Sequence, residues 1–484
     1  MQKHDFYING KWVKSDSPDE LHIINPATEK SLGTIKLGNE KDVDKAVIAA
    51  RHSFHSYSQL SVKHKIDLLT TIREIYKRRL EDVAHAIQFE MGAPKHLALN
   101  SQAKVGLAHL KAAIEALNSH KTEYEYRDFI IRHEPIGVCG LITPWNWPIN
   151  QILSKLAPCL ASGCTAILKP SEIAPLSALV ICEILDEAKV PAGAFNLING
   201  TGQIVGEAMS SHPGIDMMSF TGSTRAGISV AKASADSVKR VSQELGGKSA
   251  NIILDDELFE TSIRKGVQEC MENTGQSCNS PTRMLVPISR KKDAYEIAVS
   301  EAENIIVGDP NEDPTIIGPV VSNIQFEKVQ KLIQIGIDEG AKLLSGGIGR
   351  PNGLKEGYYI KPTIFGEVNN NMQIAKEEIF GPVLSIIPYK NIEDAIFIAN
   401  DTEYGLAAYI SGKDREKLNF IARKLRAGQI HINYSSGGAY APFGGYKQSG
   451  NGREKEKWGL EEFLEVKAIL GTKTVSVDNM KIYV

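Results

Sequence analysis

One cysteine of the sequence stands where a thiol could react. Cys278 ends the segment NTGQSC, which is polar, contains a glycine and directly follows a helical pattern. A thiolate attacks carbonyl carbons, so an accessible cysteine at this place could form a covalent intermediate. Taken alone, a cysteine is more often a structural thiol, because reactivity needs a lowered pKa or a nearby base that spacing does not reveal.

Two further polar residues could assist such a thiol. Glu244 lies in QELGGK, where two glycines allow a tight turn, and a carboxylate there could act as a general base. Asn146 lies in PWNWP after an apolar strand, where its amide could bind an oxyanion and Trp145 and Trp147 could wall a pocket. A solvated glutamate and a rigid aromatic turn are the alternatives.

A phosphate site is predicted in FTGSTRAG. A β-rich run ends there, Gly222 permits close approach of the backbone, and Ser223 and Thr224 can cap a helix. The start of a helix offers free N–H groups and a positive dipole end to a pyrophosphate, although an ordinary capped helix explains the same letters. The nearby GTGQIVG at 200–206 is one residue too long for the dinucleotide fingerprint GxGxxG.

Two other segments place ligand-binding residue types beside predicted strands. Lys169 and Glu172 lie in LKPSE, which closes the run TAILK. A carboxylate there can accept both hydroxyls of a ribose and would repel a 2′-phosphate, which favours NAD over NADP. Glu378 and Phe380 alternate in EEIFGP before the run VLSII and could hold and pack a ligand ring. A simple turn is the alternative interpretation of each segment.

The elements that must position these residues alternate along the chain. In the first series, β-rich runs and helical patterns occupy 136–142, 165–169, 174–188, 195–198, 217–221 and 224–236. In the second series, they occupy 251–254, 257–272, 283–286, 322–339, 383–387, 391–400, 414–426 and 428–433. This alternation predicts two α/β domains, each with a doubly wound parallel sheet.

Three further segments complete the predicted organisation. Apolar residues at steps of three and four predict one helix over 62–90, which Met91–Pro94 ends. The glycine-rich stretch 437–452 has too many turn residues for regular structure and is predicted to be an ordered functional loop. The tail FLEVKAILGTKTV at 463–475 alternates as a strand that adds to another element or another subunit.

Length and composition are those of a large folded protein. The 484 residues suffice for about three domains of roughly 150 residues. A chain that is 42% hydrophobic and 23% charged is globular and not disordered. The net charge of −3, from 55 basic and 58 acidic residues, gives no global positive field, so neither nucleic acid nor a membrane surface is an expected partner.

The N-terminus and the cysteines indicate a cytoplasmic protein. The segment MQKHDFYINGKW lacks the apolar core of a secretory signal, and no stretch reaches the roughly 18 apolar residues of a membrane-spanning helix. The six cysteines show no CxxC or CxxH spacing, so neither a metal site nor a disulfide framework is expected. Most of the cysteines are predicted to be small buried residues.

The order and separation of these motifs resemble those of the NAD(P)-dependent aldehyde dehydrogenases. The resemblance covers nearly the whole chain, and its motifs are highly specific when taken in combination. It is carried by YINGKW at 7–12, NPAT at 25–28, PWNWP at 144–148, LKPSE at 168–172, FTGSTRAG at 220–227, ELGGKSANI at 244–252, GQSC at 275–278, EEIFGPV at 377–383 and PFGGYKQSGNGRE at 442–454.

The resemblance implies three parts and a set of partners. A Rossmann-like NAD-binding domain would comprise 1–117 and 136–247, and a catalytic domain 248–446. A β-stranded oligomerisation arm would comprise 118–135 and 447–484, in a homodimer or homotetramer. The implied substrate is a small aldehyde, and the implied cofactor is NAD, with NADP possible.

The resemblance also implies roles for single residues. Cys278 matches the family's nucleophile, Glu244 its general base, and Asn146 the residue that shares an oxyanion hole with the Cys278 backbone N–H. The predicted cofactor contacts are Lys169 and Glu172 at the adenosine ribose, Gly222 and Ser223 at the pyrophosphate, and Glu378 and Phe380 at the nicotinamide ribose and ring. Trp145 is a further predicted cofactor contact.

These roles define a reaction. Cys278 would attack the aldehyde to give a thiohemiacetal, which loses hydride to the cofactor and becomes a thioester. Water deprotonated by Glu244 would then hydrolyse the thioester to the carboxylic acid. Sulfur suits both steps because it attacks well and leaves well.

One stretch departs from the family. After Asn146, the family often continues with Phe or Tyr and then apolar residues, whereas this chain has Trp147 and then the polar Asn150 and Gln151. We hypothesise a substrate mouth that accepts oxygenated or polar aldehydes. No arginine adjoins Cys278 to favour a carboxylated semialdehyde.

Three alternatives remain at the level of sequence. A CoA-acylating aldehyde dehydrogenase would pass the thioester to a thiol and would not need Glu244. A cysteine-dependent acyl hydrolase could use the same three catalytic residues but leaves LKPSE and FTGSTRAG unexplained. A non-enzymatic role would be signalled by loss of the cysteine or the glutamate, and both are present.

Overall fold

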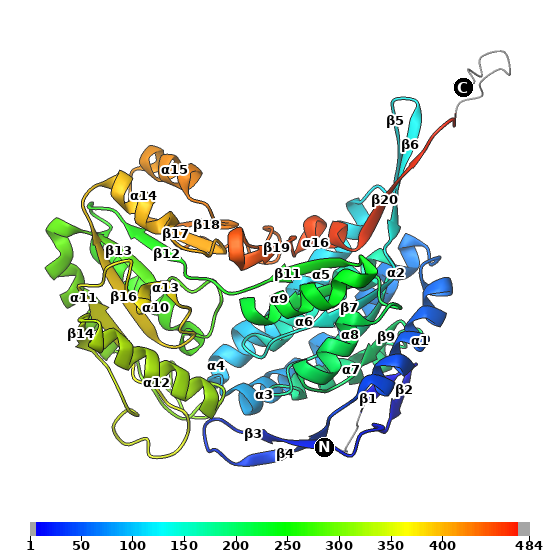
Figure 1. The fold of residues 1–484 in the computed structure, drawn as a ribbon, viewed down its shortest axis with the longest axis horizontal. Helices are drawn as coiled ribbons and strands as arrows, with labels where there is room; N and C mark the ends of the chain where they lie inside the picture. The colour runs from blue at the N-terminus through cyan, green and yellow to red at the C-terminus, as the bar shows by residue number, and fades with distance from the viewer. Residues whose placement is uncertain (1–5, 473–484) are drawn as a thin grey trace.

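The first of two α/β bodies is built on an eight-stranded sheet. The computed structural model describes residues 6–472. The strands of this sheet are β1 (Phe6–Ile8), β2 (Lys11–Val13), β7 (Val138–Ile142), β8 (Thr165–Lys169), β9 (Phe195–Leu197), β10 (Met217–Thr221), β11 (Arg240–Glu244) and β19 (Gly450–Asn451). Their order is β19-β11-β10-β7-β8-β9-β1-β2, and the five central strands are parallel (Figure 1).

The second body is built on a seven-stranded sheet. Its strands are β12 (Ala250–Ile253), β13 (Arg283–Pro287), β14 (Lys342–Ser345), β15 (Thr363–Gly366), β16 (Val383–Tyr389), β17 (Ala407–Ser411) and β18 (Gln429–Ile432). Their order is β14-β15-β16-β13-β12-β17-β18, and only β14 runs antiparallel to its neighbour. The predicted class, two α/β bodies on parallel sheets, is confirmed, with antiparallel edge strands in addition.

Helices cover both sheets. In the first body they are α1 (Glu40–Tyr57), α2 (Val62–Arg78), α3 (Leu80–Met91), α4 (Lys95–Leu97), α5 (Lys104–Ser119), α6 (Pro148–Ser162), α7 (Leu176–Glu187), α8 (Glu207–Ser211), α9 (Thr224–Ser234) and α16 (Glu456–Glu462). In the second body they are α10 (Phe259–Met271), α11 (Lys291–Glu303), α12 (Asn323–Asp338), α13 (Gln373–Lys376), α14 (Ile392–Asn400) and α15 (Arg415–Lys424).

Alternation along the central strands explains why both faces of the first sheet are covered. Successive side chains of a strand point to opposite faces. On β8, Leu168 packs into the cluster formed with α2, α3 and α5 to α7, whereas Ile167 packs into the cluster formed with α1, α8 and α9. On β10, Met217 and Met218 divide in the same way. The apolar runs of the sequence are therefore strands buried on both sides.

Parallel pairing brings the carboxyl ends of the strands to one edge. Thr221 of β10 pairs with Glu244 of β11, and Ile142 of β7 pairs with Lys169 of β8. Ligands of open α/β sheets bind at this edge. The register therefore gathers the turns that follow β7, β8, β10 and β11, which contain most of the predicted site residues of the first body.

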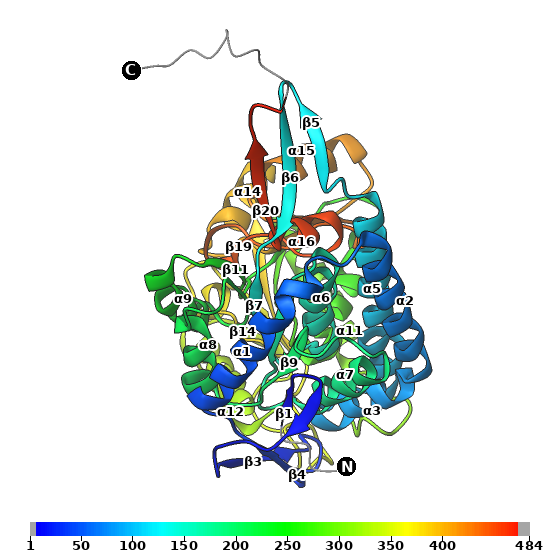
Figure 2. The same cartoon turned by 90° about the vertical axis from the view of Figure 1, so that its right-hand side faces the viewer.

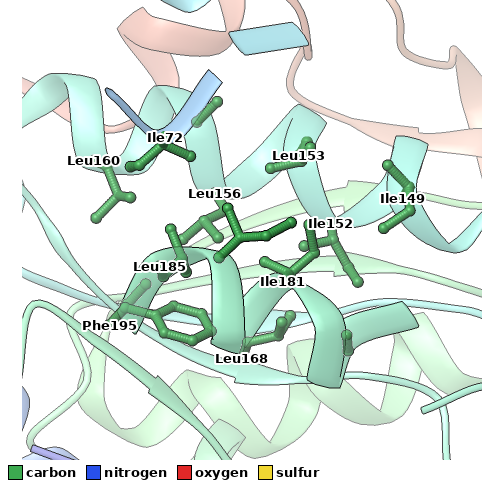
Figure 3. Close-up of a cluster of buried hydrophobic side chains, with 14 of the residues drawn as sticks. Ile72, Ile149, Ile152, Leu153, Leu156, Leu160, Leu168, Ile181, Leu185 and Phe195 are labelled. Carbon is green, nitrogen blue, oxygen red and sulfur yellow. The ribbon is translucent and has the colours of Figure 1, made fainter. Parts of the chain in front are cut away.

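α6 is the central buried helix of the first body. Pro148 occupies its first turn and Gly163 ends it at a φ of 97°. Every residue of α6 except Asn150 is buried. Figure 3 shows Ile152 and Leu156 directed at Ile181 and Leu185 of α7. This packing fixes the start of α6, and with it the PWNWP turn.

The single helix predicted over 62–90 is wrong. The structure has two helices, α2 and α3, which meet at Arg79, where φ is −97° and ψ is 14°. The Arg79 guanidinium binds Asp82 and Glu183, and Glu183 lies on α7. The apolar spacing continues across the bend because both helices face the same core, so periodicity alone did not reveal the break. The predicted stop is confirmed, with Gly92 at a φ of 74°.

A three-stranded arm projects from the first body (Figure 2). It contains β5 (Glu123–Tyr126), β6 (Phe129–Pro135) and β20 (Leu464–Ile469), paired antiparallel in the order β20-β6-β5. A separate hairpin, β3 (Glu20–Ile24) and β4 (Ser31–Lys36), lies near the N-terminus. The predicted tail strand is confirmed as β20, and its residues 473–475, like 476–484 of the predicted arm, lie outside the described residues.

The glycine-rich segment connects the two bodies. Within 437–452 the structure has a short 3₁₀ turn at Lys447–Ser449, a single bridge from Phe443 to Glu454, and the two-residue β19, which pairs with β11. α16 then packs against α5 and α6.

The predicted domain boundaries stay a prediction. Between residues 6 and 472, no helix combines the length and the apolar character needed to cross a membrane.

Candidate active site

A cavity of about 210 Å³ lies at the carboxyl ends of β7 and β10, between the two bodies. Its lining is Pro144, Trp145, Asn146, Gln151, Thr221, Gly222, Ser223, Leu245, Gly246, Cys278, Gln325, Lys328, Glu378 and Phe380. Three predicted site residues, Lys169, Glu172 and Glu244, do not line it and lie at the ends of β8 and β11. The structure thus gathers the other predicted residues around one space.

A strained turn brings Cys278 to this cavity. After α10, Asn273–Gly275 have φ values of 54°, 58° and 70°. Such left-handed conformations are costly for residues other than glycine and persist only where the surroundings enforce them. The Asn273 amide does so by donating to the backbone oxygens of Asn146, at 2.8 Å, and Gln276, at 3.2 Å. The segment before Cys278 is therefore bound to the PWNWP turn.

Asn146 offers one side-chain N–H to the site. The residue is 2% exposed, and its Nδ2 donates a 3.0 Å hydrogen bond to the backbone oxygen of Gln276. An amide nitrogen carries two hydrogens, so the second stays available to an oxygen atom beside Cys278. This geometry fits a preorganised oxyanion donor.

Glu244 is enclosed and unpaired. It is 2% exposed, and neither carboxylate oxygen has a hydrogen-bond partner within the described part of the chain. Burial raises its pKa well above the usual glutamate value, and Glu454 raises it further, whereas Lys155 and Arg453 oppose the shift. A raised pKa makes a carboxylate a stronger base once it is ionised, so Glu244 could take a proton from water.

A buried ion pair close to Glu244 was not predicted from the sequence. Lys155 of α6 pairs with Glu454, and the two side chains are 1% and 8% exposed. Lys155 is the single charged residue in PINQILSKLAPCLAS. A lone lysine in an otherwise uncharged buried helix requires a partner, which is the signal that could have found it.

The charges around Cys278 disfavour its thiolate. Burial raises the pKa of Cys278 above the ordinary cysteine range, and the nearby Glu378 and Glu244 raise it further. The other five cysteines are free and buried, as predicted, whereas Cys278 is partly exposed. In the protein alone, therefore, Cys278 is reachable but protonated.

The start of α9 has the shape predicted for a phosphate site. The Gly222 N–H donates to the backbone oxygen of Glu244 at 3.1 Å. Ser223 caps α9 by accepting from the N–H of Ala226 at 3.3 Å. The buried Thr221 hydroxyl has no hydrogen-bond partner among residues 6–472. An unpaired hydroxyl beside a helix N-terminus, both at one cavity, fits a pyrophosphate.

Lys169 and Glu172 form a pair at the end of β8. Lys169 Nζ lies 3.0 Å from Glu172 Oε2 and also donates to the backbone oxygen of Pro170 at 3.0 Å. The Lys169 side chain is 3% exposed, whereas that of Glu172 is 29% exposed. The lysine thus holds a solvent-accessible carboxylate at the ligand-binding edge of the sheet, which fits the hydroxyls of a ribose.

Glu378 and Phe380 face the same cavity from the second body. Glu378 Oε1 accepts the N–H of Gly247 at 2.9 Å, and burial raises the Glu378 pKa. Phe380 has a φ of 61°, an uncommon value for a bulky residue, and its ring meets that of Trp145 edge to face at 5.4 Å. Strained residues of this kind cluster at ligand sites. Lys328 also lines the cavity and was not predicted.

The polar stretch after PWNWP divides between two environments. Gln151 is 4% exposed and lines the cavity. Asn150 Oδ1 lies 2.8 Å from Nε2 of the buried His109, whose pKa burial lowers to about 4. A neutral His109 with its hydrogen on Nε2 donates to Asn150, which leaves the Asn150 amide N–H groups for other partners. Across the described residues, no group of three or more His, Cys, Asp or Glu is arranged to hold a metal ion.

Comparisons with known proteins agree on one family. Residues 12–469 match the family model described as "Aldehyde dehydrogenase family". The chain is 52% identical over 468 residues to 3-succinoylsemialdehyde-pyridine dehydrogenase of a Pseudomonas species, covering 96% of this chain and 98% of that protein.

Solved structures are similar over the same span. A mutant of aldehyde dehydrogenase C from Pseudomonas syringae, crystallised with NAD⁺ and octanal, superposes with a TM-score of 0.97 at 47% identity and covers 98% of both chains. A betaine aldehyde dehydrogenase mutant from Staphylococcus aureus in complex with NAD⁺ superposes with a TM-score of 0.95 at 33% identity, covering 99% of this chain and 98% of that one. Fold, cavity and similarity together place this chain in the aldehyde dehydrogenase family.

Proposed function

We propose that this protein oxidises an aldehyde to its carboxylic acid with NAD, through a thioester on Cys278 that is hydrolysed by water activated by Glu244. The observation that carries the proposal is that Cys278 and the Asn146 amide line one cavity, while the buried, unpaired carboxylate of Glu244, at the end of β11, lies near enough to raise the pKa of Cys278. The Asn146 amide has a free N–H for an oxyanion, whereas the Cys278 thiol and the Glu244 carboxyl must each lose a proton before their steps.

The first half of the reaction uses Cys278 and Asn146. The Cys278 sulfur, once deprotonated, bonds to the aldehyde carbon, and the carbonyl oxygen becomes an oxyanion. The free N–H of Asn146 and the Cys278 backbone N–H stabilise that charge, and one such donor lowers a barrier by roughly 3 to 4 kcal/mol. Bound NAD supplies a hydride acceptor, and loss of hydride from the carbon leaves a thioester on Cys278.

The second half uses Glu244. The carboxylate takes a proton from water, and the resulting hydroxide bonds to the thioester carbon. The C–S bond then breaks, which releases the carboxylic acid and returns the Cys278 thiolate. Glu244 must be ionised for this step, so its raised pKa shifts the activity toward higher pH than an ordinary glutamate would.

The cofactor contacts follow from the same cavity. Glu172, held by Lys169, would accept the adenosine ribose hydroxyls. Trp145 lines the cavity against Phe380 and would contact the cofactor there. Gly222, Ser223 and the unpaired Thr221 hydroxyl would bind the pyrophosphate. Glu378 and Phe380, which line the cavity from the second body, would hold the nicotinamide ribose and ring.

Replacing Glu172 with glutamine should relax the choice of cofactor. The carboxylate repels a 2′-phosphate, so its neutralisation should raise kcat/KM with NADP relative to NAD by about tenfold, which corresponds to roughly 1.4 kcal/mol of lost repulsion. Steady-state kinetics with both cofactors measure the ratio. Glu183→Gln, on α7 and paired with Arg79, is the matched control. An unchanged ratio in Glu172→Gln would remove this residue from the discrimination.

The substrate mouth gives a second prediction. Gln151, which lines the cavity, should favour aldehydes that bear an oxygen acceptor over unsubstituted alkanals of equal length. In the wild type, a bound alkanal leaves the buried Gln151 amide without a hydrogen-bond partner, which is costly. Gln151→Leu removes this cost and should shift kcat/KM toward alkanals by about tenfold. A panel of short hydroxy- or keto-aldehydes and alkanals up to octanal tests this. If octanal, the ligand of the Pseudomonas syringae relative, is the best substrate of the wild type, the polar preference is wrong.

We propose that the arm joins copies of this chain into a homodimer or homotetramer. Its outer strands β5 and β20 are exposed, and they carry apolar side chains such as Tyr126 and Val466, which are 50% and 67% exposed. Exposed apolar edge strands are normally covered by another chain.

With all six cysteines free, we also propose a cytoplasmic location.

A charge on the arm should therefore weaken assembly. Val466→Asp should shift the mass measured by light scattering from a multiple of the 53.0 kDa chain toward a single chain. Val238→Asp, at a 91% exposed position outside the arm, is the matched control and should leave the mass unchanged. A wild type that is already monomeric would contradict the proposal.

A direct assay separates the proposed function from its alternatives. Purified protein, NAD and a short aldehyde should produce NADH and the free acid without CoA. Stimulation by CoA would instead support a CoA-acylating enzyme. Ester hydrolysis without any NADH from an aldehyde panel would support an acyl hydrolase.

A further inference from the structure

A hydrogen bond joins the PWNWP turn to the residue next to the nucleophile. Trp147 Nε1 donates to Ser277 Oγ at 2.8 Å. Trp147 directly precedes α6 in the first body, and Ser277 directly precedes Cys278 in the second. The bond therefore links the wall of one body to the catalytic segment of the other.

The two ends of this bond differ in their backbone surroundings. Trp147 stands before Pro148, whose ring restricts the backbone, and before the enclosed helix α6. Ser277 follows the left-handed residues Asn273–Gly275 and is partly exposed, so its hydroxyl would otherwise bond to water. The indole thus acts as a fixed point for a segment that is under strain.

The bond also depends on both residue types. The indole N–H of tryptophan is a donor only, at the far edge of a large rigid ring. Phenylalanine at this position has no donor, and alanine at 277 has no acceptor. Asn146, one residue before Trp147, bonds to Gln276, one residue before Ser277, so the two contacts run side by side. Together they set where the Cys278 sulfur stands relative to the Asn146 amide.

We propose that Trp147 and Ser277 are positioning residues that hold Cys278 in line with the oxyanion donor Asn146. The inference rests on the proposed function, because it assigns a geometric requirement to the attack by Cys278. Without the bond, the thiol remains present and reachable, but its alignment with the Asn146 N–H is lost for part of the time. The step that suffers is formation of the tetrahedral oxyanion, since only this step needs the sulfur and the donor together.

The test compares Trp147→Phe, Ser277→Ala and the double variant. Each should form NADH in a single turnover about tenfold more slowly than the wild type, the factor for one hydrogen bond of about 1.4 kcal/mol. The double variant should be no slower than the singles, because all three lack the same bond. The dissociation constant for NAD, measured by calorimetry, should not change. Ser277→Thr keeps the acceptor and should recover most of the rate.

A second reaction of the same thiol separates positioning from loss of structure. Iodoacetamide alkylates Cys278 without forming an oxyanion, so its rate should change less than about twofold in these variants. Equal losses in both reactions, or multiplied losses in the double variant, would overturn the proposal. Melting temperatures and the control Trp458→Phe, on α16, reveal general destabilisation. If Cys278→Ala is as active as the wild type, the proposed function fails. If Cys278→Ala is inactive but Trp147→Phe and Ser277→Ala keep the full rate, only this inference fails.

Discussion

Cys278→Ala should lose aldehyde oxidation, with the rate of NADH formation falling at least about a thousandfold. Without sulfur no covalent bond to the aldehyde carbon forms, and binding plus the oxyanion donor support only weak residual catalysis. The measurement is initial-rate NADH formation at saturating aldehyde and NAD. Binding of NAD should persist, because the proposed cofactor residues Gly222, Ser223 and Glu378 lie on other elements.

The matched control is a cysteine of the first body, away from the cavity. Cys182→Ala removes a buried thiol of α7 and should keep wild-type turnover. Substantial NADH formation by Cys278→Ala would mean that Cys278 is not the nucleophile. Loss of activity in both variants would point to general damage.

The pH dependence of Cys278 gives an independent check. Because burial and the acidic neighbours Glu378 and Glu244 raise the pKa of Cys278, the thiolate fraction is small at neutral pH in the protein without cofactor. Alkylation by iodoacetamide should therefore keep rising with pH beyond the ordinary cysteine range. A plateau near neutral pH would show that the surroundings favour the thiolate instead.

Local sequence predicted the central parts of both sheets. Runs such as TAILK and MMSFT became β8 and β10 with the predicted bounds, because strands buried on both faces are continuous apolar runs. β11, RVSQE, was not predicted, because it has only one apolar residue. It forms a strand by pairing with β10 and β19, which are distant in sequence or added from the C-terminal part of the chain. Its place in the sheet, and the position of Glu244 at its end, therefore depend on contacts that the local sequence does not show.

In the candidate site, too, single residues could be predicted from the sequence, whereas contacts between distant segments could not. The motifs located Asn146, Gly222 and Cys278 because each lies in a turn with a distinctive composition. The contacts between distant segments could not be read from spacing. The Lys155–Glu454 pair and the Trp147–Ser277 bond join residues 299 and 130 positions apart, and nothing local encodes which partner is chosen.

Glu244→Gln should separate the two halves of the reaction. The variant keeps Cys278 and Asn146, so one equivalent of NADH per active site should form in a burst, followed by steady-state turnover reduced by about a hundredfold or more. Glutamine has nearly the same shape as glutamate but cannot take a proton from water. Rapid mixing with NAD and a short aldehyde measures burst and steady state together.

The pH profile gives the sign of the effect. Since the Glu244 pKa is raised by burial and by Glu454, the ionised base appears as pH rises through that raised value and disappears as pH falls through it. Wild-type steady-state turnover should thus increase with pH, and Glu244→Gln should lose this dependence. Glu90→Gln is the control, because Glu90 is also buried, with a pKa raised to about 7, but caps α7 away from the cavity.

The outcome of the Glu244 variant also decides between hydrolysis and transfer. If deacylation depends on water activated by Glu244, a strong external thiol or hydroxylamine should restore turnover of the stalled thioester, because these nucleophiles need no base. Loss of the burst itself would place Glu244 in the acylation half, as the base for Cys278. Unchanged steady-state turnover would show that the enclosed carboxylate is not the base, however well its unpaired oxygens are placed.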